Sequence, residues 1–222
     1  MLQKLLSTFF LFFCFISSAQ VVINEIDADN PGSDIFEFVE LKSSTPNFPL
    51  DGYVLVFFND SNSSSYYTFD LDGFVTDING IIHFGNVAVS PAAVGIIPNN
   101  KIQNGPDVVA LYLGNDTDFP LNTLATTANL VDALAYSGNN NQPVAMMTTL
   151  GITACTNENI NSLVVSQSIQ RKNDGTYEVK SSTPGVNNDG SGVVPNYITV
   201  STSQTSYNEG ESFNIVFSTS QP

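Results

Sequence analysis

The chain has 222 residues, of which 42% are hydrophobic, and it carries a formal net charge of −15 at pH 7. This hydrophobic fraction supports a folded core, whereas 21 acidic residues against 6 basic ones exclude the cationic surface that nucleic-acid binding requires. Of the two cysteines, Cys14 lies in the leader described next, so we expect no disulfide within the folded region.

The first 19 residues have the pattern of a secretion signal. Lys4 precedes an apolar run from Leu5 to Ile16, and small residues close the segment before Gln20. The apolar run is shorter than the roughly 20 residues that a membrane-spanning helix needs. We therefore expect residues 1–19 to be a signal peptide, the mature chain to have no membrane span, and the protein to be secreted or held at the cell surface.

From Val21 onward, short apolar runs alternate with turn residues, and no stretch keeps a helical apolar stripe for three turns. The pattern predicts an all-β fold, with strands that mostly have one buried and one wet face, as in a β-sandwich. Tyr53–Phe58 is apolar throughout, which predicts a central strand covered on both faces. The predicted strands are Val21–Ile26, Phe36–Leu41, Tyr53–Phe58, Tyr66–Phe69, Ile81–Phe84, Val94–Ile97, Val108–Leu113, Leu130–Tyr136, Ser168–Arg171 and Thr176–Val179. A tight Asp, Asn, Pro and Gly loop is expected between the first two.

The composition changes near the end of this region. We expect the sandwich to span residues 21–188, followed by a linker at residues 189–196, where apolar density is low. A new β pattern follows, with strands predicted at Ile198–Ser201 and Phe213–Ser218. A lone hairpin is marginal in water, so residues 197–222 are expected to be the incomplete start of a second β domain, similar to an Ig-like or Calx-β-like sandwich.

Several segments resemble the bacterial exported lamin tail domain family. They are VVINEIDADNPGSDIFEFVEL at Val21–Leu41, LDGYVLVFFN at Leu50–Asn59, FDLDGFVTDINGIIHFGN at Phe69–Asn86, NGPDVVALY at Asn104–Tyr112, LVDALAY at Leu130–Tyr136, SIQRKNDGTY at Ser168–Tyr177 and STPGVNN at Ser182–Asn188. The resemblance implies an immunoglobulin-like β-sandwich of the lamin tail type. It also implies a non-catalytic module that accompanies extracellular nucleases, phosphatases, proteases or adhesins. The Asn-rich stretch Gly138–Ser162 matches no segment of the family.

Two acidic loops are candidates for a cation site. The first holds Asp27, Asp29 and Asp34, and the second holds Asp70, Asp72 and Asp77. Carboxylate, amide and carbonyl oxygens are the ligands that Ca²⁺ prefers, so these residues are weak candidates for a calcium site. Neither loop has the EF-hand spacing. The alternative is that the same side chains cap their own backbone in Asx turns.

The residues that could carry catalysis do not combine into a known arrangement. Glu37 and Glu40 resemble a carboxylate pair, but an odd spacing places two strand residues on opposite faces. His83 is the single histidine, and no serine lies in a nucleophile elbow. Cys155 has no neighbouring basic residue in the sequence to activate its thiol. We therefore expect no catalytic residues in this region and no required cofactor.

Together these patterns predict a spacer, adhesion or substrate-targeting module of a larger secreted or cell-surface protein. The alternative is an N-terminal accessory domain of an extracellular nuclease or other phosphoester hydrolase whose catalytic domain lies beyond residue 222. The expected partners are other domains of the same chain, with glycans or surface proteins as further candidates. Direct nucleic-acid binding is not expected from so acidic a domain.

Overall fold

A computed structural model describes residues 20–161, 167–191, 198–202 and 215–219, the last two segments without side chains. The predicted signal peptide lies outside the described residues. The strands are β1 (Val21–Asp27), β2 (Phe38–Ser43), β3 (Tyr53–Asn59), β4 (Ser64–Asp70), β5 (Ile81–Gly85), β6 (Gly95–Ile96), β7 (Asp107–Leu113), β8 (Leu130–Ser137), β9 (Cys155–Asn157), β10 (Gln167–Arg171), β11 (Tyr177–Ser181), β12 (Ile198–Thr202) and β13 (Ile215–Thr219).

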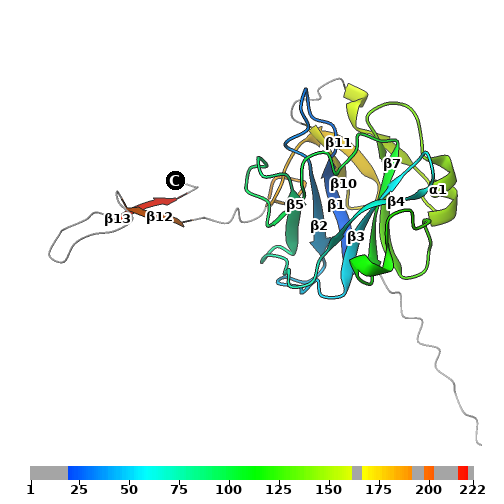
Figure 1. Ribbon diagram of the computed structural model, residues 1–222. Helices are drawn as coiled ribbons and strands as arrows, with labels where there is room; N and C mark the ends of the chain where they lie inside the picture. The colour runs from blue at the N-terminus through cyan, green and yellow to red at the C-terminus, as the bar shows by residue number, and fades with distance from the viewer. Residues whose placement is uncertain (1–19, 162–166, 192–197, 203–214, 220–222) are drawn as a thin grey trace, which may run out of the picture.

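Strands β1 to β11 form a β-sandwich, and β12 and β13 form a separate two-stranded sheet (Figure 1). One sheet has 6 strands in the order β11-β10-β1-β2-β5-β6, and the facing sheet has 5 in the order β4-β3-β7-β8-β9. Most neighbours are antiparallel, but β5–β6 and β8–β9 are parallel pairs. The all-β sandwich predicted from the apolar periodicity is therefore confirmed.

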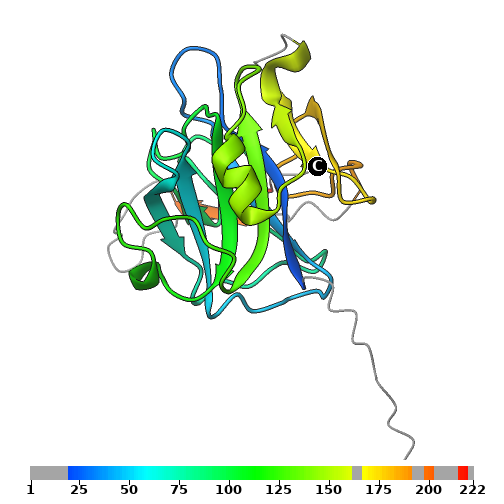
Figure 2. The same cartoon turned by 90° about the vertical axis from the view of Figure 1, so that its right-hand side faces the viewer.

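The core lies between the two sheets, where alternating residues of each strand meet. Ile23 and Leu41 from one sheet pack with Leu55 and Leu111 from the other in a single buried cluster. A second cluster covers the outer face of the β3–β7–β8 sheet, where α1 (Val144–Leu150) lies across the strands (Figure 2). Strand β3 contributes to both clusters, which confirms that its wholly apolar sequence marks a strand covered on both faces.

Two local expectations differ from the structure. Strands β1 and β2 pair as an antiparallel neighbour pair, but the connection from Ala28 to Glu37 is a long loop rather than a tight turn. Its Asn and Asp side chains hold it in shape through the contacts described below. The segment Gly138–Ser162, where no element was predicted, contains α1, β9 and the 3-10 turn η2 (Glu158–Asn161). Its elements are too short for their periodicity to stand out.

The predicted strands near the end of the chain are present. Strands β12 and β13 pair antiparallel, with Ile198 opposite Thr219 and Thr202 opposite Ile215. None of the helices among the described residues is long and apolar enough to cross a membrane.

Candidate functional site

A row of polar side chains crosses the outer face of the β10–β1–β2–β5 sheet. Gln170, Glu25, Glu40 and His83 are successive cross-strand partners, while the alternate residues point into the core. All four are almost completely buried, with exposed fractions of 0%, 0%, 0% and 3%. A bulge between Ile23 and Glu25 changes the register of β1 at this point. The sandwich thus carries two adjacent buried carboxyl groups on an outer sheet face, and something must cover them.

The cover is the segment after β11, residues 182–189, which we call the strap. Thr183 donates its backbone N–H to Glu25 Oε1 at 2.7 Å and its hydroxyl to Oε2 at 2.7 Å. Gly185 donates its N–H to Glu40 Oε2 at 2.7 Å. Further along, Asn188 donates its side-chain amide to the carbonyl oxygens of Asn24 and Arg171 at 3.0 and 2.8 Å. The strap therefore satisfies the buried carboxyl groups with its own donors.

Gly185 allows this close approach. It has a φ of +80°, and a Cβ atom there would lie 3.3 Å from His83 Cε1. The ring of His83 is also held by the loop after β5, because its Nε2 lies 3.0 Å from the carbonyl oxygen of Pro91. The sole histidine is thus fixed between the strap and the loop after β5.

The strap gives a testable domain boundary. Because Thr183, Gly185 and Asn188 are bonded to the sheet, we expect limited proteolysis of residues 20–222 to spare residues 183–188 and to cut after Ser191, where the sequence predicts a linker. Mass spectrometry of the stable fragment should show an end at or beyond Ser191. A stable fragment that ends before β10 would contradict this boundary, because it would lack the strand that pairs with β1.

Burial controls the ionisation of the row. It raises the pKa of Glu25 against the opposing effect of hydrogen bonds from Ser168 and Thr183. Burial also raises the pKa of Glu40, and the neighbouring Glu25 carboxyl adds to the increase. The pKa of His83 is lowered by burial. Burial therefore disfavours the charged form of all three groups.

The first acidic loop does not gather its three predicted ligands around one point. Asp29 accepts hydrogen bonds from the side chains of Asn104 and Asn159 at 2.7 and 2.6 Å. Asp27 instead accepts a hydrogen bond from the side-chain amide of Asn30 at 2.6 Å. Asp34 accepts one from the backbone N–H of Asn30 at 3.1 Å. Each carboxylate thus already has a partner in the loop or beside it.

Glu37, at the end of this loop, is an exception. It is completely buried, and neither of its carboxylate oxygens accepts a hydrogen bond of normal geometry. Burial, with the nearby charges of Asp34 and Asp27, raises its pKa to about 8, against smaller opposing effects of Asn86 and Asn100. Burial and the Glu25 carboxyl likewise raise the pKa of Asp27 to about 8. The sequence predicted Glu37 and Glu40 on opposite faces of one strand, Phe36–Leu41. That prediction is wrong for Glu37, because β2 begins at Phe38.

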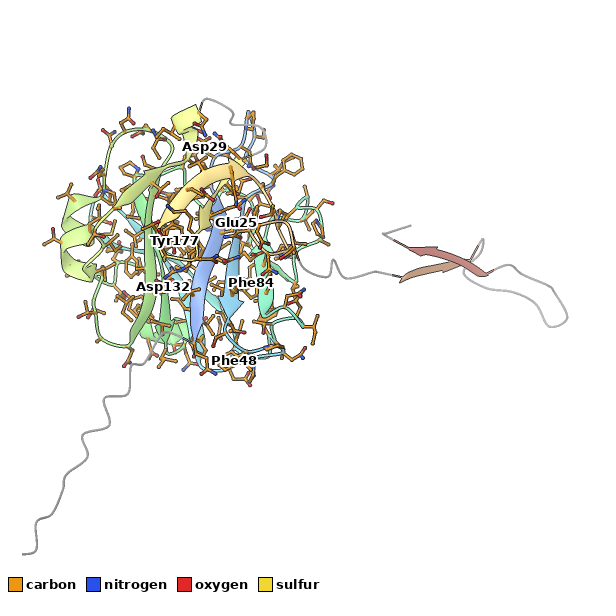
Figure 3. The ribbon with its side chains drawn as sticks, turned by 180° about the vertical axis from the view of Figure 1, so that it is seen from behind. Glu25, Asp29, Phe48, Phe84, Asp132 and Tyr177 are labelled. Carbon is orange, nitrogen blue, oxygen red and sulfur yellow. The ribbon has the colours of Figure 1, made fainter. Side chains whose placement is uncertain are left out.

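The second acidic loop lies at the opposite end of the sandwich. Figure 3 shows Asp29 at one end and Phe48, which is hydrogen-bonded to Thr76 of the second loop, at the other. Asp70 accepts the N–H of Asp72 at 2.9 Å, and Asp77 accepts the N–H groups of Asn79 and Ile81, both at 2.8 Å.

Asp72 accepts the N–H of Gly52 at 2.6 Å, across to a neighbouring turn. The bonds of Asp70 and Asp77 are those of side chains that cap their own backbone, the alternative considered for these residues. Among the residues whose side chains the structure describes, no group of three or more His, Cys, Asp or Glu is placed to hold a metal ion. Calcium binding by either loop stays a prediction.

Cys155 is half-buried, and burial raises the pKa of its thiol to about 11. The thiol is therefore protonated at neutral pH and lacks the thiolate that makes cysteine a nucleophile.

A cationic pocket was missed by sequence reasoning. Of the 6 Lys and Arg residues, Lys4 is in the leader and Lys101 lies over the Tyr67 ring. The other four line one pocket of about 370 Å³ on the outer face of the strap-covered sheet: Lys42, Arg171, Lys172 and Lys180. One feature of the sequence could have indicated this pocket. Basic residues are scarce, yet three of them lie close together, within Arg171–Lys180.

Comparison of the chain with protein-family models and with curated proteins gave no match.

Proposed function

We propose that residues 21–191 form a non-catalytic module of an exported protein, with a spacer, adhesion or substrate-targeting role. The observation that carries the proposal is the bonding of the buried row. Four hydrogen bonds reach Glu25, from Ser168, Gln170 and two groups of Thr183. Glu40 accepts bonds from Asn24 and Gly185. The acidic groups best placed for acid–base chemistry are therefore used to fasten the strap.

Two of the segments that resemble the lamin tail family are joined by hydrogen bonds in the fold, and this supports the proposal. The NEID segment supplies Asn24 and Glu25, and the STPGVNN segment supplies the strap residues that bond to them. The motifs that carry the resemblance to lamin tail domains are thus physically coupled in the fold. On this basis we propose a lamin tail type of sandwich, with immunoglobulin-like character.

The proposal predicts that the secreted chain does not hydrolyse nucleic acid, peptide or phosphoester substrates. A hydrolase needs a nucleophile and a base that approach each other and a substrate. Here His83 is bonded to Pro91, and Glu25 and Glu40 are bonded to the strap. The measurement is product formation by the purified chain with each substrate class. Turnover that disappears in a His83→Ala or Glu40→Gln variant, with the β fold retained by circular dichroism, would overturn the proposal.

An accessory domain of an extracellular hydrolase is the other hypothesis for the whole protein. It gives residues 21–191 the same non-catalytic role and differs in the domain that it places beyond residue 222. The sequence of the gene downstream decides between the two, because a hydrolase would show a clustered set of His, Asp, Asn and Glu there.

A further inference from the structure

The cationic pocket is built by three parts of the chain. Strands β1 and β2 supply its floor, including Val22 and Lys42. The β10–β11 hairpin supplies one wall with Lys172, Glu178 and Lys180, and the returning end of the strap supplies the other with Asn187. These parts are far apart in sequence, so the fold itself brings the lysines together.

The basic groups differ in their availability. The Arg171 guanidinium donates to Asp132 Oδ2 at 3.0 Å and to the Tyr177 hydroxyl at 2.8 Å, so it is committed to Asp132 of the facing sheet and to Tyr177 of its own hairpin. Lys180 lies 3.2 Å from Glu178, and Lys172 lies 3.8 Å from the exposed Asp174. Such surface ion pairs contribute little and exchange readily with other partners.

Lys42 is held differently. Its Nζ donates to the side-chain carbonyl of Asn187 at 2.7 Å, a neutral partner. The Asp189 carboxylate is also near, because hydrogen bonds from Ser191 and, after them, the charge of Lys42 lower the pKa of Asp189. Asn188 fixes the same part of the strap through its bonds to Asn24 and to Arg171 O. The ammonium group is thus positioned by a rigid segment, which lowers the ordering cost of binding.

We infer that this pocket binds a carboxylate-bearing saccharide, such as a uronic acid residue of a polysaccharide. This inference rests on the proposed function and names a ligand for its substrate-targeting role. Lys42 and Lys180 stand on strands that β1 and β10 separate, so one carboxylate of the saccharide would meet Lys42 and the carboxylate of a neighbouring sugar would meet Lys180. The hydroxyls would meet the Asn187 amide and the Glu178 carboxylate. Val22 and the lysine stems offer apolar surface to the ring. A volume of about 370 Å³ lies within the range of small-molecule sites.

The charge pattern favours a sugar acid over a phosphate. Glu178 and Asp189 both line the pocket, and two carboxylates would repel a phosphate dianion. They can, however, accept hydrogen bonds from sugar hydroxyls. The net charge of −15 gives polyanions no long-range attraction, so a polyuronate would be held by its contacts inside the pocket rather than by the overall field of the protein.

The test is a titration of the secreted chain, residues 20–222, with a trigalacturonate, a neutral hexose trisaccharide and inorganic phosphate. Isothermal calorimetry measures affinity, and chromatography of the same mixtures detects any shortened saccharide. The variants are Lys42→Gln and Lys180→Gln. Lys101→Gln is the matched control, because it makes the same charge change outside the pocket.

We expect the trigalacturonate to bind with a Kd below about 1 mM, and each pocket variant to weaken it by about ten-fold, the size of one lost charge-assisted hydrogen bond. Lys101→Gln should bind like the wild type, and phosphate and the neutral trisaccharide should bind more weakly. Failure of trigalacturonate to bind, tighter binding of either other probe, or equal weakening by Lys101→Gln overturns the inference and leaves the proposed function standing. Cleavage of the saccharide overturns the proposed function instead.

Discussion

Replacing Glu25 by Ala is expected to destabilise the sandwich more than any other single change to the polar row. The substitution leaves the buried hydroxyl of Ser168 and the half-buried N–H and hydroxyl of Thr183 without their acceptor. Each buried group without a partner costs about 1–3 kcal/mol, so the total loss should be about 3 kcal/mol or more. For a domain of this size, that corresponds to a decrease in Tm of roughly 6–12 °C. Thermal unfolding followed by circular dichroism measures it.

Two further variants serve as controls for the effect of Glu25→Ala. Glu25→Gln keeps one carbonyl oxygen for Ser168 and the Thr183 N–H, so it should cost clearly less than Glu25→Ala. Glu178→Ala makes the same truncation at an exposed glutamate on β11, whose ion pair with Lys180 is at the surface, and should change the stability by about 0.5 kcal/mol or less. If Glu25→Ala and Glu178→Ala have equal effects, the strap is not held by Glu25.

Raising the pH from 5 to 8 is expected to destabilise the folded protein through Glu37. Its pKa is raised from 4.5 to about 8 in the folded state, so the folded chain holds this proton while the unfolded chain releases it. The contribution of the Glu37 proton to the free energy of unfolding is fully present below the pKa of the unfolded chain, and it is lost as the pH rises through the pKa of the folded chain. Asp27, raised from 3.8 to about 8, acts in the same direction. His83, whose pKa is lowered, opposes them below pH 6.5.

The Glu37→Gln variant isolates this effect. It removes the titrating group at the same size, so its Tm should exceed that of the wild type at pH 8, by on the order of 5 °C, and approach it at pH 5. Comparing the two proteins at each pH cancels the titration of the other groups. Glu178→Gln, at an exposed site, should show no such pH-dependent difference. An unchanged gap between wild type and Glu37→Gln from pH 5 to 8 would show that Glu37 ionises normally.

The strands were predictable because each one buries a face, and burial leaves its mark as a period of two in the sequence. Strand β3 departs from this period, since both of its faces are buried and its wholly apolar run meets one core cluster on each side. The helix α1 was not predictable, because Val144–Leu150 is too short to display a helical stripe. The long β1–β2 loop was missed because its shape depends on Asn30 contacts that no local pattern reveals.

The candidate sites were less predictable than the fold. The strap has little apolar character, and its composition resembles that of the linker after it, although its N–H groups are bonded to Glu25 and Glu40. Those partners are more than 100 residues away in sequence, so composition carries no trace of them. The cationic pocket was hidden for the same reason, since Lys42 and Lys180 line one pocket only once the sheet has folded.

The most direct test of the structural role of the buried acids is the amide hydrogen exchange of Thr183 and Gly185 in a chain of residues 20–222. If Glu25 and Glu40 fasten the strap, both amides exchange as slowly as those of β1 and β2, and Glu25→Ala accelerates exchange at Thr183. Exchange at both amides as fast as in an unfolded peptide would mean that the strap is open and the two carboxyl groups are free, and the account of a non-catalytic, strap-sealed module would be contradicted.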